Sequence, residues 1–158
     1  MQIFLAKTAG FCFGVDRAVS LVEQTIARGE KAVTLGPIIH NRHVVDRFNR
    51  LGVREIASPA EAAQEETVIL RAHGVPQAVQ AELAARGLRV VDATCPFVKK
   101  IHHIVQRAEA QGRRCIIIGS PEHPEVTAIA SFCTAPMIVP TAEALEDALE
   151  ADKSLHCY

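Results

Sequence analysis

Six side chains that can do chemistry fall in short segments rich in glycine and proline. They are Cys12, His40, His73, Cys95, His123 and Glu125. A thiolate can bind a metal or an iron–sulfur cluster, an imidazole can donate a hydrogen bond to a phosphate oxygen, and a carboxyl group can transfer a proton. Taken singly, each has a plainer explanation, since many cysteines are buried inert thiols and most loop histidines lie at the surface.

The elements that would position these residues follow a β–α alternation. We predict strands at residues 3–6, 32–35, 53–56, 67–70, 88–91, 115–118, 137–139 and 154–157. We predict helices at residues 15–26, 44–51, 77–86, 96–112, 125–132 and 142–149, and a short helix that opens at Ser58-Pro59. The alternation predicts an α/β fold of small parallel sheets covered by helices. A soft boundary would divide it into two units, residues 1–93 and 94–158.

All six residues lie in segments that follow a predicted strand and precede a predicted helix. In an open α/β sheet, the loops at the carboxyl ends of the strands meet at one crevice, where ligands bind. Helix N-termini at such loops attract phosphate groups and favour thiolates. The sequence therefore predicts one site that combines two thiols, three imidazoles and a carboxylate.

The other candidate side chains receive plainer interpretations. Cys115 lies in an apolar strand and Cys133 follows a helix, so we interpret both as structural. The remaining histidines are interpreted as surface or helix-face residues without a role: His43, His102, His103 and His156. The helical stripe of Val98, Ile101 and Val105 is interpreted as core, and strand 88–91 as buried.

Composition excludes several classes of protein. The chain has 158 residues and a formal net charge of -1, whereas a nucleic-acid-binding domain usually carries a basic excess. No apolar run approaches the roughly 20 residues of a membrane span, and the start does not have the pattern of a signal peptide. The five cysteines are widely spaced without a CxxC pair, which argues against a zinc ribbon or a disulfide framework. We therefore expect a cytoplasmic protein that binds neither nucleic acid nor membrane.

Five short motifs resemble those of the LytB/IspH family of iron–sulfur reductases. Residues 10–18, which read GFCFGVDRA, are similar to the opening motif G-F-C-x-G-V-x-R-A of that family. The segments IHN (39–41), AHGV (72–75), DATCP (92–96) and EHPEV (122–126) follow in the order and approximate spacing of the family. One such tetrapeptide would mean little, but five in order across most of the chain are specific.

The resemblance implies an oxidoreductase of the non-mevalonate (MEP) pathway of isoprene biosynthesis. Such an enzyme converts 4-hydroxy-3-methylbut-2-enyl diphosphate to isopentenyl diphosphate and dimethylallyl diphosphate. Cys12 and Cys95 would be two of the three cysteine ligands of a 4Fe-4S cluster. His40, His73 and His123 would contact the diphosphate of the substrate.

In the same resemblance, Glu125 matches the acid that protonates the departing hydroxyl group. Ferredoxin or flavodoxin would donate the electrons. Family members are about twice this length and hold three α/β units, so we expect two here, the second incomplete. The third cluster cysteine would lie further on, and Cys157 does not take its place. We therefore expect this chain alone to be inactive as a reductase.

Three other functions remain open from the residues. A cysteine nucleophile activated by a histidine would need one Cys–His contact and no iron. A non-catalytic phosphate-binding module would use the three loop histidines without a cluster. A homodimer could pool two cysteines from each chain around one cluster.

Overall fold

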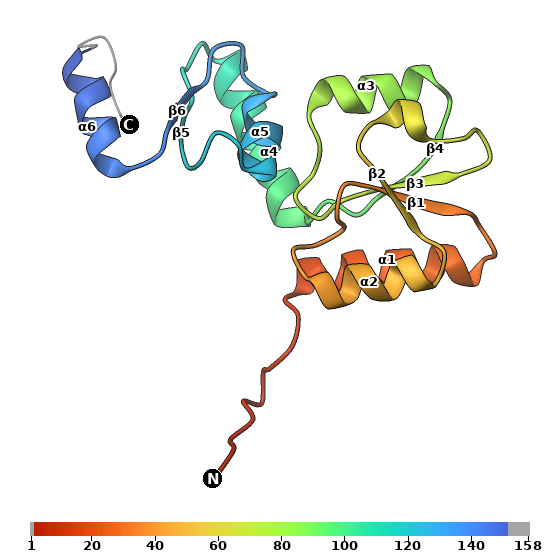
Figure 1. Cartoon of the computed structure of the whole chain (residues 1–158). Coiled ribbons are helices and arrows are strands. Elements are labelled where there is room, and N and C mark those ends of the chain that lie inside the picture. The colour runs from red at the N-terminus through yellow and green to blue at the C-terminus, as the bar shows by residue number, and fades with distance from the viewer. Residues whose placement is uncertain (1, 152–158) are drawn as a thin grey trace.

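The computed structural model describes residues 2–151, which form an α/β fold with two parallel sheets (Figure 1). The larger sheet has the order β2-β1-β3-β4, with bounds Arg54–Ile56, Ala32–Leu35, Thr67–Leu70 and Arg89–Asp92. All its neighbouring strands are parallel. The predicted fold class is confirmed, whereas the predicted strand at 154–157 lies outside the described residues, as do His156 and Cys157.

The four strands of this sheet end at the same level. Leu35, the last residue of β1, is in register with Ile56 of β2 and with Leu70 of β3. Leu70 is in turn in register with Asp92, the last residue of β4. The loops that follow the strands therefore begin side by side at one edge.

Helices cover both faces of the larger sheet. Helices α1 (Phe13–Ala27) and α2 (Arg42–Arg50) lie on one face, and α3 (Gln77–Ala85) with the 3-10 turn η1 (Pro59–Glu61) lies on the other (Figure 1). Each face has its own apolar core, and Ile69 of the central strand β3 is completely buried in the α1–α2 core. Strands buried on both faces are typical of parallel sheets.

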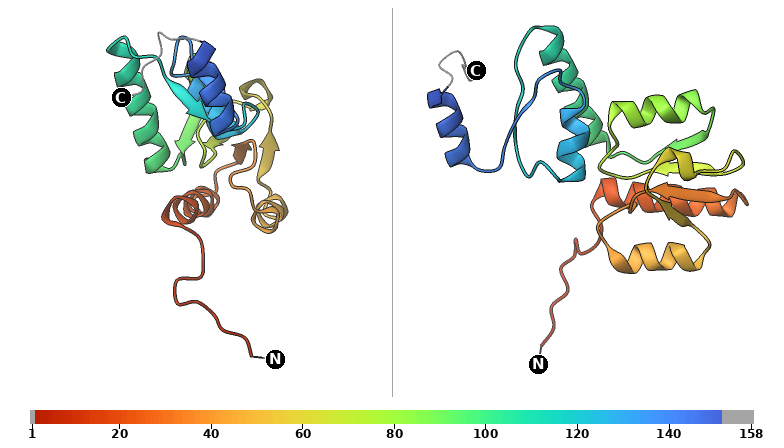
Figure 2. Two further views of the ribbon diagram at one scale, coloured as in Figure 1. Left: turned by 90° about the vertical axis from the view of Figure 1, so that its left-hand side faces the viewer. Right: turned by 45° about the horizontal axis from the view of Figure 1, so that its top comes forward.

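A smaller sheet follows in the second part of the chain. It pairs β5 (Ile116–Ile118) with β6 (Met137–Val139) in parallel. Helices α4 (Pro96–Ala110) and α5 (Pro124–Ala130) lie between the two sheets, and α6 (Ala142–Ala151) lies at the far end (Figure 2). The division at residue 93 stays a prediction.

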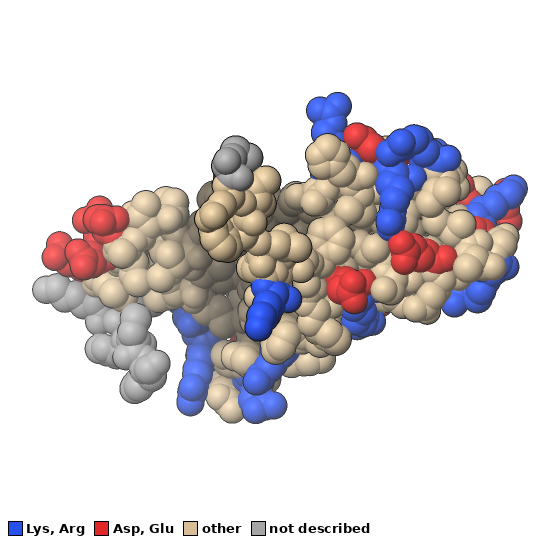
Figure 3. Space-filling model, turned by 90° about the horizontal axis from the view of Figure 1, so that it is seen from below, with Lys and Arg blue, Asp and Glu red and all other residues tan. Residues whose placement is uncertain are grey.

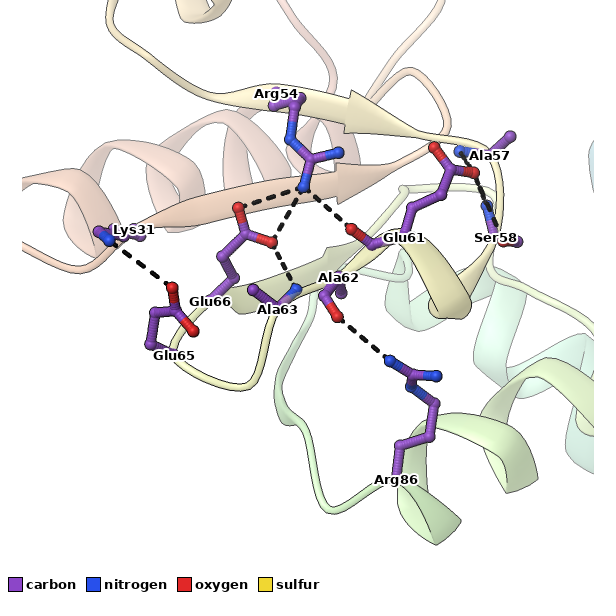
Figure 4. A network of polar contacts seen from close by, with 10 residues as sticks. All are labelled: Lys31, Arg54, Ala57, Ser58, Glu61, Ala62, Ala63, Glu65, Glu66 and Arg86. Carbon is purple, nitrogen blue, oxygen red and sulfur yellow. Dashed lines mark hydrogen bonds and ion pairs between the residues drawn. The ribbon is translucent and has the colours of Figure 1, made fainter.

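Polar contacts fix the connection between β2 and β3 (Figure 4). The Arg54 guanidinium donates hydrogen bonds of 3.0 Å to the Glu61 carbonyl and to a Glu66 carboxylate oxygen. Ser58 and Glu61 form a capping box at the place where the sequence predicted a short helix. Because most of these side chains are exposed, each ion pair contributes little, and the network acts mainly by fixing the loop.

The face of the molecule seen from below mixes charges of both signs. Lys and Arg side chains are interspersed with Asp and Glu over the first sheet and its helices, whereas acidic side chains gather at the opposite end, over α6 (Figure 3). No helix among residues 2–151 combines the length and the hydropathy that a membrane span requires.

Two predicted strands differ from the structure. Residues 3–6 form no strand, and their apolar side chains are exposed, with Phe4 87% exposed. This segment pairs with none of the strands of either sheet in the described part of the chain. The strand predicted as buried at 88–91 is β4, which lies at the edge of the sheet and leaves Val90 41% exposed.

The predicted core stripe of α4 is wrong at one position. Val98 and Val105 are buried, but Ile101 is 39% exposed, and His102 is buried in its place with 5% exposure. A period of 3.6 residues allows either neighbour to face the core, and apolarity alone favoured the isoleucine. His102 takes the buried position because its ring stacks on the aromatic ring of Phe132, at a centroid distance of 4.4 Å.

Replacing Ile69 with alanine tests how much the central strand β3 contributes to the free energy of unfolding. We expect Ile69→Ala to lower the free energy of unfolding by about 2–5 kcal/mol, because a large side chain leaves a cavity in a closed core. Val90→Ala on the edge strand is the matched control and should cost about 1 kcal/mol or less. Urea unfolding followed by circular dichroism measures both, and equal losses would contradict this view of the sheet.

Candidate functional site

Three imidazole rings from distant parts of the sequence form one cluster. The ring centroids of His40 and His73 lie 4.4 Å apart, and that of His123 lies 5.9 Å from each of them. The rings are tilted or edge-on to one another, with interplanar angles of 36°, 59° and 88°. Several imidazole nitrogens therefore lie within reach of one anion of moderate size.

Backbone hydrogen bonds hold the loops of this cluster together. The Ala72 N–H, directly before His73, donates to the Ile38 carbonyl at 3.1 Å, two residues before His40. The Cys95 N–H donates in turn to the Ala72 carbonyl at 2.9 Å. These bonds continue the parallel pairing past the ends of β1, β3 and β4, and they bring the loop of a cysteine beside the loops of two histidines.

His73 is held in its neutral form. Burial, together with the nearby His40, His123 and Arg71 side chains, lowers the pKa of His73 to about 4. Its Nδ1 atom is also buried without a hydrogen-bond partner. A buried polar atom without a partner is costly and is often found where a protein binds a ligand.

The loop of His73 is supported from two sides. The Arg71 Nε donates to the Gly74 carbonyl at 3.1 Å. Gly74 adopts a φ of +77°, and a Cβ there would lie 3.0 Å from the His102 ring, so glycine is required for both reasons. His102, stacked on Phe132, therefore packs under this turn. From the sequence, His102 is interpreted as a surface or helix-face residue without a role, and only its helical spacing from Val98 could have indicated burial.

The two predicted cluster cysteines begin two helices whose first turns meet. Cys12 is the N-cap of α1 and Cys95 the N-cap of α4, and neither thiol is used in a capping hydrogen bond. The Cys95 Sγ packs onto Gly14, where an added Cβ would lie only 2.6 Å from the sulfur. The phenylalanines that follow closely, Phe13 and Phe97, are both exposed. Two free thiols thus lie on neighbouring loops, which fits part of a cluster site.

Arg17 ties these two segments together. Its guanidinium donates hydrogen bonds to the Asp92 carbonyl at 3.1 Å and to the Thr94 carbonyl at 3.3 Å, in the segment that leads to Cys95. The Asp92 carboxylate also forms an ion pair with Lys99 on α4. Sequence reasoning assigned no function to Arg17, although its place in the opening motif was an available signal.

His123 and Glu125 lie at the start of α5, which connects the two strands of the smaller sheet. His123 is the N-cap of α5, and its Nδ1 accepts a hydrogen bond from the Glu125 N–H at 3.2 Å. This bond assigns the ring proton of the neutral imidazole to Nε2, which is then a donor. Glu125 lies half-buried in the first turn of α5. The structure thus places His123 in the cluster, and the acid role of Glu125 stays a prediction.

The thiols of Cys115 and Cys133 lie together elsewhere. With a carboxylate oxygen of Glu109, their sulfur atoms fall within 4.8 Å of one another. Burial, together with a hydrogen bond from the Cys133 thiol to the Cys115 side chain, raises the pKa of Cys133 to about 12. Cys133 is therefore protonated near neutral pH, which argues against a nucleophile at that residue.

Comparisons with known proteins show the family of this chain. The family model described as LytB protein matches residues 3–157. Over 156 residues the chain is 38% identical to the 4-hydroxy-3-methylbut-2-enyl diphosphate reductase of Clostridioides difficile (strain 630), covering 98% of this chain and 56% of that protein. It is 42% identical over 158 residues to the enzyme of the same name from Aquifex aeolicus (strain VF5), covering 97% of this chain and 53% of that protein.

Two solved structures share the fold. One is described as the structure of (E)-4-hydroxy-3-methyl-but-2-enyl diphosphate reductase, the terminal enzyme of the non-mevalonate pathway. It matches with a TM-score of 0.79 and 40% identity, over 94% of this chain and 54% of that one. The E-1-hydroxy-2-methyl-but-2-enyl-4-diphosphate reductase of Plasmodium falciparum matches with a TM-score of 0.84 and 27% identity, over 89% and 45%. The chain spans about half the length of the curated relatives it matches. The family match and the shared fold confirm the family predicted from the five motifs: this chain belongs to the LytB family.

Proposed function

We propose that this chain supplies the diphosphate-binding histidines and two cluster cysteines of a 4-hydroxy-3-methylbut-2-enyl diphosphate reductase. The observation that carries the proposal is the cluster of His40, His73 and His123, whose centroids lie 4.4–5.9 Å apart. The names of the relatives give the substrate class, an allylic diphosphate. In the overall reaction the substrate takes up two electrons and two protons and loses its hydroxyl group as water.

The three histidines would bind the diphosphate and orient the substrate. His123 presents an Nε2 donor because its Nδ1 already accepts from Glu125. His73 is neutral and half-buried, so an anion nearby would favour its protonated form. His40 and His73 are held by loops of the larger sheet and His123 by the start of α5. These donors would fix one end of the substrate and leave its hydroxyl end to the cysteine loops.

The residues that would hold an iron–sulfur cluster are Cys12 and Cys95. Both thiols are free of capping bonds, and Arg17 fixes the loop of Cys95 against α1. When bound, the cluster would supply the electrons for the reduction. Glu125 would hold the proton that the departing hydroxyl needs. It lies in the first turn of α5, two residues after His123, and therefore stays near the imidazole of His123. Ferredoxin or flavodoxin would be the electron donor, as the family resemblance implies.

Pyrophosphate binding tests the histidine cluster directly. We expect the chain to bind pyrophosphate, and His40→Ala, His73→Ala or His123→Ala to weaken binding about tenfold or more. A hydrogen bond to a charged group contributes about 1.5–3 kcal/mol, which sets that scale. Isothermal titration calorimetry measures the affinities, with His103→Ala on the exposed face of α4 as the control. Equal affinity in all four variants would refute the assignment.

The low pKa of His73 predicts how this binding depends on pH. Free His73 has a pKa of about 4 and is neutral at pH 7. A bound diphosphate would raise the pKa of His73, so binding is coupled to the uptake of a proton by this residue. The affinity for diphosphate should therefore increase as the pH falls from the pKa of His73 in the complex toward its pKa in the free chain. Pyrophosphate itself titrates, so the measurement is the difference in pH dependence between the unchanged chain and His73→Ala. The steeper slope should belong to the unchanged chain, and identical slopes would contradict the prediction.

The amount of acid-labile sulfide that the chain retains tests whether Cys12 and Cys95 bind an iron–sulfur cluster, independently of the histidines. After anaerobic incubation with ferrous iron and sulfide, followed by desalting, we expect the unchanged chain to retain more sulfide than Cys12→Ser/Cys95→Ser. The double variant Cys115→Ser/Cys133→Ser is the control and should retain as much as the unchanged chain. If Cys12→Ser/Cys95→Ser kept the full amount of sulfide, these residues would not be the cluster ligands.

A further inference from the structure

We propose that Cys115, Cys133 and Glu109 form a metal site for a thiophilic divalent cation of the Zn²⁺ class. The site is distinct from the histidine and cysteine loops described above. Two sulfur atoms and a carboxylate oxygen, all within 4.8 Å of one another, are brought together from three separate elements. Thiolate and carboxylate donors in a set of three match zinc sites that keep a fourth position open.

The donor spacing suits a tetrahedral ion. With bonds of about 2.3 Å to sulfur and about 2.0–2.2 Å to oxygen, neighbouring ligand atoms lie about 3.5–3.8 Å apart. The three donors now lie at most 4.8 Å apart. They would have to approach one another by about 1 Å to hold the ion. The two sulfur ligands favour zinc or cadmium over magnesium or calcium, which prefer oxygen.

Hydrogen bonds already fix the backbone around each donor. The Cys115 carbonyl accepts from the Met137 N–H at 3.0 Å, which sets the start of β5 against β6. The Cys133 N–H donates to the Ala130 carbonyl at 3.0 Å, at the end of α5. The Thr134 N–H donates to a Glu109 carboxylate oxygen at 2.8 Å. That last bond orients the carboxylate and leaves its other oxygen for a metal, as outer-shell partners do in known sites.

The site lies far from the predicted cluster cysteines. Cys95 caps the N-terminus of α4, whereas Glu109 lies in its last turn, fourteen residues further. At 1.5 Å per residue this places the two about 21 Å apart along the helix axis. One helix thus carries a ligand set at each end, and the two sets can be tested independently.

A metal here would strengthen the weaker half of the structure. The smaller sheet has two strands of three residues each, and such a sheet has little stability of its own. An ion bound to Glu109, Cys115 and Cys133 would join α4, β5 and the turn after α5. Because the ion would bind only the folded arrangement, its binding stabilises that fold by mass action.

The test uses Cd²⁺ as a spectroscopic probe on the 158-residue chain carrying Cys12→Ser, Cys95→Ser and Cys157→Ser. Under a phosphine reductant, we expect one Cd²⁺ per chain with a thiolate-to-cadmium absorption band in the ultraviolet. Zn²⁺, added in competition, should displace it and raise the melting temperature. Glu109→Gln, which can still accept from the Thr134 N–H, should weaken Cd²⁺ binding tenfold or more.

The matched control adds Cys115→Ser and Cys133→Ser to the same background, and it should show no band. Absence of the band in the parent variant, or an equal band in the control, would overturn the proposal. Unchanged Cd²⁺ affinity in Glu109→Gln would overturn the three-ligand assignment.

A second measurement uses the unmodified chain and does not depend on the serine background. We expect Zn²⁺ to slow the alkylation of Cys115 and Cys133 by iodoacetamide, as read by peptide mass spectrometry. Equal alkylation rates with and without Zn²⁺ would count against the site. A disulfide between the two thiols that forms in air, with no Cd²⁺ binding after reduction, would also overturn it.

Discussion

The arrangement of the site follows from one feature of the larger sheet, which is that its parallel strands end in register at one edge. Leu35, Leu70 and Asp92 end neighbouring strands in register, so the loops that follow begin at the same edge. Backbone hydrogen bonds then continue beyond the sheet, from Cys95 to Ala72 and from Ala72 to Ile38. Because these bonds satisfy backbone groups that would otherwise be buried and unpaired, the loops have little freedom to separate.

The histidine cluster joins the two sheets chemically. His40 and His73 come from loops of the larger sheet, whereas His123 comes from the turn before α5, beside the smaller sheet. An anion that bound all three would therefore draw the two parts of the chain together. The cluster is prepared for this in an unusual way, since burial keeps His73 neutral and leaves its Nδ1 without a partner. Ligand binding can recover the free energy that this arrangement costs.

Helix α4 organises the second part of the chain around this edge. Its N-terminus begins with Cys95 beside the first turn of α1, and its middle presents His102 under the turn at Gly74. Its last turn carries Glu109 next to Cys115 and Cys133. Arg17 of α1 anchors the start of α4, because its guanidinium donates two hydrogen bonds to the loop before that helix. One rigid element thus serves both the proposed reductase site and the proposed metal site.

The sequence alone determined the element order, since hydrophobic periodicity and Gly or Pro punctuation are local signals. It placed β1, β3 and β6 at their observed residues and put six reactive side chains in the loops and first helical turns between elements. The family motifs added the expected roles. Three outcomes could be seen only in the folded chain. Residues 3–6 have no strand partner, and His102 is buried where Ile101 was expected. The thiols of Cys115 and Cys133 lie beside the carboxylate of Glu109. Those outcomes depend on which surfaces are brought into contact by chain segments distant in sequence, and no local pattern of residues contains that information.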